Sequence, residues 1–291
     1  MTSDILYDDI NLPEKVSDIL QHDFWMMRHV NKMMAATVTN PVKFSAFTSI
    51  FVSKGEAQAD INLITYDIKA PCVINIAHGD IILPRTISPD FEASFVVFSP
   101  KLTRDITEPV RDTPLLAKAT GKPVVALSPA SSVVLEKFYD ELQDISTDPS
   151  IQLPYETLLY ALIAFFLRYS ARYYQEQPQD LNNSSHQRIS DRFIRLVQAH
   201  FRTERFLDYY AARLEITPKH LSRLIRQQTG MRAVEWINRH IILEAQVMLR
   251  SSNLTVQQIA EQLNFSTQSS FGKYFKKATG ISPKDFRNSF S

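Results

Sequence analysis

Hydrophobic and polar residues follow one another in two different patterns along the chain. In the first hundred residues, short apolar segments rich in β-branched and aromatic side chains are separated by Gly, Pro, Asp or Ser. The clearest of these segments are FTSIFV (47–52), ADINLITYDI (59–68), CVINIA (72–77), DIILP (80–84) and SFVVFS (94–99). Short strands at such close intervals are typical of a β-sandwich or β-barrel. The pattern therefore predicts a small N-terminal β-barrel.

Helical spacing replaces this pattern further along the chain. Residues 133–145 carry apolar side chains at 134, 135, 138, 142 and 145, and residues 155–174 form a long apolar segment after Pro154. Both patterns predict helices that accompany the barrel. The Met-rich segment 14–34 has weak helical character. A polar stretch without apolar periodicity then predicts a linker. The predicted parts are an N-terminal domain over 1–175, a linker over 176–187 and a C-terminal domain over 188–291.

The C-terminal domain contains an internal repeat. AARLEITPKHLSRLIRQQTG (211–230) and AEQLNFSTQSSFGKYFKKATG (260–280) both run from Ala through Leu to a two-residue turn, a hydroxyl residue and a closing Thr-Gly. The second copy is one residue longer. A short helix, a tight turn and a second helix make a helix-turn-helix unit. We therefore predict an α+β chain whose C-terminal domain is all-α and carries two such units.

The second helix of each unit has suitable residues at both ends. Thr217 and Ser266 are the predicted N-caps, because a hydroxyl oxygen there can accept a hydrogen bond from a backbone N–H in the first turn. Pro218 fits the first helical turn, where its missing N–H does no harm. Gly230 and Gly280 are predicted to end the helices in the left-handed conformation.

Helical spacing divides each of these second helices into two faces. The face predicted to be buried holds Leu221, Leu224, Ile225 and Gln228 in the first unit, and Phe271, Tyr274, Phe275 and Ala278 in the second. The opposite face is polar and cationic, with Lys219, Ser222, Arg223 and Arg226 in the first unit, and Gln268, Ser269, Gly272, Lys273 and Lys276 in the second. His220 lies at the border between the faces. Such side chains can hydrogen-bond base edges or phosphates of a DNA major groove.

A connecting helix is predicted between the units. Residues 233–250 have apolar side chains at 237, 241, 245, 248 and 249. A helix of this length can hold the two units about one DNA turn apart, roughly 34 Å. One protomer could then read two successive major grooves.

The charges are segregated in the same way. Residues 188–291 contain 17 Lys and Arg against 8 Asp and Glu, so their net charge is +9, while residues 1–187 carry −8 and the whole chain +1. A basic domain joined to an acidic one indicates a polyanionic partner for the basic part.

Composition also bears on the compartment. The single cysteine, Cys72, excludes an internal disulfide framework, fits a reducing cytosol and is expected to be a small buried residue. The acidic start MTSDILYDDINLPEK argues against a secretory signal. The apolar run LLYALIAFFL (158–167) has about half the length that a bilayer span needs. We expect a cytoplasmic protein with no membrane partner.

Little in the sequence indicates catalysis. The histidine in IAHGD, His78, has no neighbouring His or Glu at ligand spacing, so a turn histidine is favoured over a metal ligand. There is no nucleophile motif, no phosphate loop and only six glycines. We expect neither a catalytic residue nor a metal or other cofactor.

Residues 188–291 resemble the DNA-binding region of the AraC/XylS family of bacterial transcription regulators. The resemblance rests on IAEQLNFSTQSSFGKYFKKATGISPKDFR, preceded by HLSRLIRQQTG and INRHIILEAQVML, and covers about a third of the chain. It implies a seven-helix region joined to an effector or dimerisation domain, and the strand-rich N-terminal part is similar in layout to the family's cupin-like sensor. By position, the resemblance implies base contacts from Lys219, Ser222, Arg223, Gln268, Ser269, Ser270 and Lys273. Gly272 and Lys273 depart from the family, where larger side chains and Arg are more usual.

The leading hypothesis is a sequence-specific transcription regulator that binds double-stranded promoter DNA. The predicted DNA-binding residues are Thr217, Lys219, His220, Ser222, Arg223, Arg226, Ser266, Gln268, Ser269, Ser270, Lys273 and Lys276. A homodimer paired through the helix at 155–174, a small-molecule effector and RNA polymerase are the further candidate partners. Two alternatives stay open: a barrel enzyme with accessory DNA binding, and an N-terminal domain that only dimerises. The direction of regulation also stays open.

Overall fold

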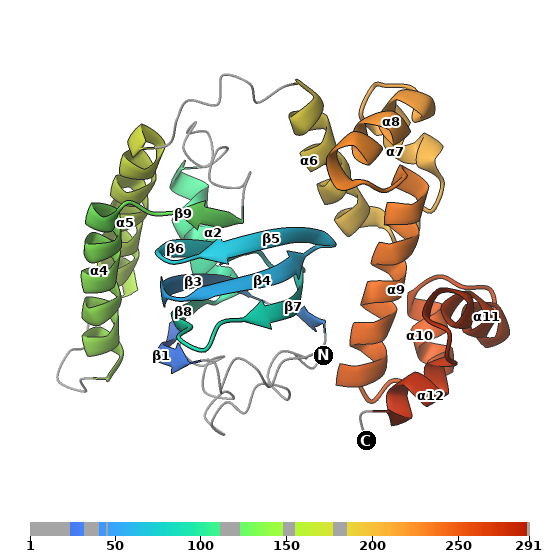
Figure 1. The fold of residues 1–291 in the computed structure, drawn as a ribbon, viewed down its shortest axis with the longest axis horizontal. Coiled ribbons are helices and arrows are strands. Elements are labelled where there is room, and N and C mark those ends of the chain that lie inside the picture. The colour runs from blue at the N-terminus through green and yellow to red at the C-terminus, as the bar shows by residue number, and fades with distance from the viewer. Residues whose placement is uncertain are drawn as a thin grey trace. The chain divides into compact units, whose positions relative to one another are not determined.

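The computed structural model shows a strand-rich N-terminal unit and a C-terminal unit whose main part, residues 185–289, consists of helices and turns (Figure 1). The first compact unit comprises residues 1–40, 44–61 and 65–180. The second comprises residues 41–43, 62–64 and 181–291. The residues whose structure is described are 24–31, 41–44, 46–110, 123–147, 155–176 and 185–289. The fold class predicted from the sequence is confirmed.

Two antiparallel sheets form the N-terminal unit. One has the strand order β1-β8-β3-β6-β9 and the other β2-β7-β4-β5. Consecutive strands repeatedly change sheets, as in a jelly-roll barrel. The strands are β1 (Phe24–Asn31), β2 (Val42–Lys43), β3 (Phe47–Lys54), β4 (Glu56–Ile61), β5 (Ile64–Lys69), β6 (Cys72–Ile76), β7 (Ile81–Ile87), β8 (Glu92–Phe98) and β9 (Val124–Ala126).

In the described part of this unit, three helices cover one face of the five-stranded sheet: α2 (Pro100–Thr107), α4 (Pro129–Thr147) and α5 (Tyr155–Glu176). Phe51 and Val96 project from the sheet into a core that contains Leu102 of α2 and Tyr139 of α4. Because side chains alternate along a strand, the neighbouring buried residues of β3 and β8 face the other sheet. In Figure 1, α4 and α5 run alongside each other. The helices predicted at 133–145 and 155–174 are confirmed.

Gly55 makes the close turn between β3 and β4. Its φ is +78°, and a Cβ there would lie 2.7 Å from Phe91 Cα. Only glycine meets both conditions without strain. This turn is where the chain passes from one sheet to the other.

Two sequence predictions in this unit were wrong. Residues 24–31 form β1 instead of part of a weak helix, because Phe24, Trp25 and Met26 pair with Phe98, Val97 and Val96 of β8. Long-range pairing outweighs weak local helical propensity. The parts of that prediction over 14–23 and 32–34 lie outside the described residues.

The segment 59–68 was predicted as one strand and is part of two. Asn62 and Leu63 both have positive φ, 49° and 69°, so they form a two-residue hairpin turn between β4 and β5. The sequence did not indicate this turn, because an apolar Leu63 stands at a turn position that usually holds Gly or Asn.

Seven helices pack around one apolar core in the described residues 185–289. They are α6 (Ser185–His200), α7 (Leu207–Arg213), α8 (Pro218–Thr229), α9 (Ala233–Ser251), α10 (Val256–Gln262), α11 (Gln268–Thr279) and α12 (Pro283–Asn288). Residues 185–187, at the end of the predicted linker, are helical. The predicted connecting helix is confirmed as α9, and the apolar residues at 237, 241, 245, 248 and 249 are all buried.

Candidate nucleic-acid interface

The turns of the two helix-turn-helix units, α7–α8 and α10–α11, begin with the same backbone geometry. Glu215 and Asn264 are both left-handed, with φ of 59° and 55°. The next residue in each turn donates its backbone N–H to the preceding helix, at 3.1 Å from Ile216 to Ala211 O and 2.8 Å from Phe265 to Ala260 O. The repeat seen in the sequence is therefore a repeat of backbone conformation.

The cap of α8 is the predicted one. Thr217 Oγ1 accepts a hydrogen bond from the N–H of His220 at 3.2 Å, and Pro218 occupies the first turn. Gly230 ends the helix in the left-handed conformation, with φ 74°, and Gly280 ends α11 in the same way, with φ 86°.

The predicted cap of α11 was wrong by one residue. Thr267, and not Ser266, is the N-cap: its Oγ1 accepts from Ser270 N–H at 3.0 Å, and Ser270 Oγ accepts from Thr267 N–H at 3.3 Å. The extra residue of the second repeat lengthens the turn rather than the helix. Such a reciprocal pair is a capping box, which satisfies two backbone donors at once.

The second helices of the two units, α8 and α11, are called the recognition helices. Their sequences align without a gap when their N-caps are matched. Both have 12 residues, and a closing threonine donates its hydroxyl hydrogen to a carbonyl one turn earlier, Thr229 to Ile225 at 2.8 Å and Thr279 to Phe275 at 2.9 Å. In this alignment Arg223 corresponds to Lys273 and Arg226 to Lys276. The cationic positions are thus repeated.

The inward faces are largely as predicted. Buried side chains at the predicted positions are Leu221, Leu224, Ile225, Phe271 and Phe275. Tyr274 is half-buried, and its hydroxyl lies 3.1 Å from Asn238 Oδ1 of α9. Ala278 is exposed, so its predicted burial was wrong: it lies in the last turn, beyond the contact with α10. The side chain of Gln228 lies outside the described residues.

A basic groove runs along the outward face of α8. It has a volume of about 690 Å³, and its lining consists of Leu207, Pro218, Lys219, Ser222, Arg223, Arg226, Gln227 and Arg232. The His220 ring lies 3.4 Å from the Arg223 guanidinium. Sequence reasoning missed Leu207, Gln227 and Arg232, which come from three elements. Helical spacing around 219–226 extends to Gln227, but no local pattern brings Arg232, the N-cap of α9, to this groove.

The outward face of α11 is also open. Gln268, Ser269, Lys273 and Lys276 are exposed, as is Ser266 in the turn. Ser270 is half-buried, and its hydroxyl donates to Thr267 O at 2.7 Å while serving the capping box. A Cβ at Gly272 would meet nothing within 4 Å, so the space beside it is open. Both helices therefore present cationic, amide and hydroxyl donors side by side, with guanidinium groups on α8 and only ammonium groups on α11. These groups can read base edges and phosphates.

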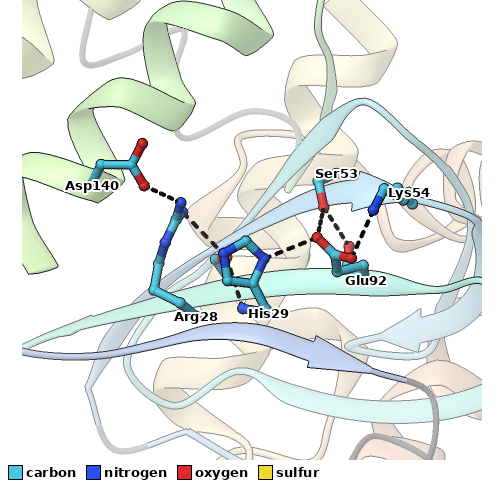
Figure 2. A network of polar contacts seen from close by, with 7 residues as sticks. Arg28, His29, Ser53, Lys54, Glu92 and Asp140 are labelled. Carbon is cyan, nitrogen blue, oxygen red and sulfur yellow. Dashed lines mark hydrogen bonds and ion pairs between the residues drawn. The ribbon is translucent and has the colours of Figure 1, made fainter.

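The N-terminal unit holds a separate network of polar contacts (Figure 2). Glu92 of β8 accepts from Lys54 at 3.0 Å and contacts His29 Nδ1 at 3.0 Å, and these hydrogen bonds, the one to His29 first, lower the pKa of its carboxyl to about 2. Arg28 pairs with Asp140 of α4 and lies 5.6 Å from the Tyr139 ring. The network ties β1 to β3, β8 and α4, and its cations are paired with carboxylates.

Two other residues singled out in the sequence, Cys72 and His78, lie in this unit. Cys72 is 1% exposed, and burial raises the pKa of its thiol to about 12, so it is the small buried residue expected. His78 lies in the turn after β6. Within the described residues, no group of three or more His, Cys, Asp or Glu is placed to hold a metal ion. No helix in that part of the chain is both long and apolar enough to cross a membrane.

Comparison with known proteins bears on this interface. The fold and the paired units define a helix-turn-helix DNA-binding domain, and a family model described as "Helix-turn-helix domain" matches residues 210–289. The transcriptional activator AarP of Providencia stuartii is 42% identical over 81 residues, which are 28% of this chain and 60% of AarP. The arabinose operon regulatory protein of Escherichia coli is 33% identical over 72 residues, 25% of each chain.

These matches define the family of the C-terminal part of the chain. That part belongs to the AraC/XylS family of helix-turn-helix transcription regulators. The matched segments span less than two thirds of either relative. The solved structure of ToxT from Vibrio cholerae covers 91% of this chain and 98% of its own, at 15% identity and a TM-score of 0.44, values too low to assign a role to the N-terminal unit.

Proposed function

We propose that the chain is a sequence-specific transcription regulator whose helices α8 and α11 read two adjacent major grooves of promoter DNA. The carrying observation is the repetition of caps, stops and cationic positions in the two units, with Arg223 and Lys273 at equivalent exposed sites. If the cationic faces of α8 and α11 only contacted solvent, these features would not need to be repeated. Two equivalent helices joined by α9 fit two successive grooves of one duplex face.

Phosphate contacts and base contacts have different roles in this proposal. The proposed base-reading residues are Lys219, Ser222, Arg223, Gln268, Ser269 and Lys273, while Thr217, His220, Arg226, Ser266, Ser270 and Lys276 position the helices on the backbone. Arg232 joins the second group, because it lines the groove beside α8.

Single substitutions test the base contacts. In Arg223→Ala and Lys273→Ala, binding to an operator selected from random DNA should lose discrimination at one or two base pairs each, by about 1–3 kcal/mol per pair. The two sets of relaxed positions should lie about one helical turn apart. Binding titrations against single-base operator variants measure both effects.

Arg239→Ala is the matched control. Arg239 is exposed on α9, pairs with Glu235 at 3.5 Å and is not among the residues assigned to base or phosphate contacts. Its loss should leave discrimination unchanged. Unchanged discrimination in Arg223→Ala and Lys273→Ala as well would refute the reading assignment.

The N-terminal unit is proposed to dimerise and to bind a small-molecule effector, and the DNA-bound protein to contact RNA polymerase in the cytoplasm. Support for an interface comes from two exposed apolar side chains on neighbouring helices, Val133 of α4 (53% exposed) and Tyr160 of α5 (68% exposed). A ligand that binds the folded state raises the melting temperature. A thermal-shift screen with metabolites, run beside sedimentation of the full chain, tests effector and dimer separately.

A further inference from the structure

Arg205 makes contacts that the repeat does not explain. It lies in the loop between α6 and α7, before the first helix-turn-helix unit. Its guanidinium donates to the carbonyl oxygens of Leu263 and, at 3.2 Å, of Asn264, both in the turn of the second unit. The same group stacks on the ring of Phe265, with 3.9 Å from Cζ to the ring centroid.

The position of these carbonyls favours a cation. Leu263 is the C-cap of α10, where backbone carbonyls have no partner within the helix and the helix dipole is negative. A guanidinium has several donors in one plane and can bond two carbonyls while its face covers an aromatic ring. Arg205 is half-buried, and this burial lowers the pKa of its guanidinium.

Both ends of the contact are held in place. On the Arg205 side, the buried Tyr210 of α7 donates its hydroxyl to Glu204 O at 2.7 Å and so fixes the loop. On the other side, Phe265 packs on Tyr274 of α11 at 5.1 Å between ring centroids, and Tyr274 bonds to Asn238 of α9. The chain of contacts therefore runs from α7 through Arg205 to the second recognition helix.

The contact is absent from the first unit. The residue at the position equivalent to Arg205, before α10, is Leu254, and the residue equivalent to Phe265 is Ile216. The Arg205 contact therefore connects the two helix-turn-helix units and is not a feature that each unit repeats. In Figure 1, α7 and α8 lie near the beginning of α9, while α10, α11 and α12 lie along its later part. Without Arg205, the turn of the second helix-turn-helix unit would lose a direct contact with the loop before α7.

We infer that Arg205 is a positioning residue that fixes the second recognition helix relative to the first, and so sets the spacing of half-sites that the protein accepts. This inference rests on the proposed two-groove reading. It concerns a residue that is assigned neither a base contact nor a phosphate contact.

The test uses the full chain with Arg205→Leu, which copies the equivalent Leu254, and Arg205→Lys, which keeps the charge but not the planar fork. Spin labels at Ala212→Cys and Glu261→Cys, in a Cys72→Ala background, occupy equivalent exposed positions on α7 and α10. Without DNA, the distance distribution between the labels should be narrow in the parent and broader or shifted in Arg205→Leu, with Arg205→Lys in between. Circular dichroism establishes that each variant is folded.

The second arm measures binding to the selected operator and to versions with one base pair inserted or removed between the half-sites. The parent should lose about tenfold or more in affinity on either change. Arg205→Leu should bind the original spacing more weakly and discriminate less between spacings. Arg213→Leu is the control, because Arg213 stacks on Tyr209 at 4.9 Å within the first unit alone.

The outcomes separate the two proposals. An unchanged distance distribution in folded Arg205→Leu, or unaltered spacing preference despite a changed distribution, overturns the role of Arg205. If Arg205→Leu does not fold, the same two criteria apply to Arg205→Lys. If the parent protein binds operators of all spacings equally well, two-groove reading is overturned. The distances between the spin labels then still decide whether Arg205 holds the two helix-turn-helix units in a fixed relative position.

Discussion

At the scale of single residues, the turn of each unit needs a left-handed backbone. Asn264 suits this conformation, since Asn tolerates it better than other side chains with a Cβ. Glu215 occupies the same conformation in the first unit, where its side chain is exposed. A residue other than Gly, Asn or Asp pays a steric cost there of about 1 kcal/mol. The first turn is therefore the more strained of the two.

Exchanging these residues should reveal the strain. We expect Glu215→Asn to raise the free energy of unfolding by about 1 kcal/mol, and Asn264→Glu to lower it by a similar amount. Urea denaturation followed by circular dichroism measures both. Asn264→Gly is the control and should have little effect, because glycine also accepts this conformation. A neutral Glu215→Asn would show that the turn is unstrained.

At the scale of elements, α9 is the centre of the C-terminal unit. Its inner face carries Trp236, stacked on His240 with ring planes 7° apart, and the ring of Phe201 lies 4.9 Å from that of His240. His240 is 2% exposed, and its Nδ1 has no hydrogen-bond partner among the described residues. Burial lowers the pKa of His240 to about 4, although the nearby Glu244 acts in the opposite direction. The imidazole is therefore neutral in the folded protein at pH 7.

This depressed pKa predicts acid sensitivity. An unfolded His titrates near 6.5, so below that pH the unfolded chain binds a proton that the folded chain does not. Above pH 6.5 the contribution of His240 to the free energy of unfolding is fully present. Below pH 6.5 the unfolded chain protonates this residue, so the free energy of unfolding should fall by about 1.4 kcal/mol per pH unit as the pH drops toward 4. Urea unfolding of the full chain between pH 5 and 6.5 measures the slope above the carboxylate range.

His240→Leu is the matching variant. Its unfolding free energy should lose that part of the pH dependence, whatever its absolute stability. The same slope in His240→Leu and the parent would assign the effect to other groups.

At the scale of the whole molecule, charge separates the two parts of the chain. Residues 1–187 carry −8 and residues 188–291 carry +9, so the DNA-binding part is tethered to a net anionic domain. Contacts with phosphates release counterions and depend steeply on salt. Repulsion between the acidic part and a duplex acts over about 10 Å at 0.1 M salt and is screened at higher concentrations. Non-specific binding should therefore be weaker for the full chain than for its basic part.

Comparing residues 181–291 alone with the full chain tests this effect. The shorter protein should bind random duplex DNA more tightly at low salt, and the two affinities should converge as the salt rises toward 1 M, where screening falls to about 3 Å. Fluorescence anisotropy over a salt series measures both. Parallel salt dependences would contradict a contribution from the acidic part.

The local features were determined by the sequence alone. Thr217, the glycine stops and the apolar face of α9 depend on neighbours within one or two helical turns, so periodicity and cap chemistry identified them. The charge segregation is likewise a property of composition. These features were enough to predict the helical unit, its repeat and the cationic helix faces.

Only the tertiary structure decided the features that join distant segments. Residues 24–31 are a strand because β8 pairs with them. Arg232 reaches the groove of α8, and Arg205 the turn of α10, through contacts between elements. The physical reason is the same in each case: burial and hydrogen bonding across the fold outweigh local preferences of about 1 kcal/mol or less.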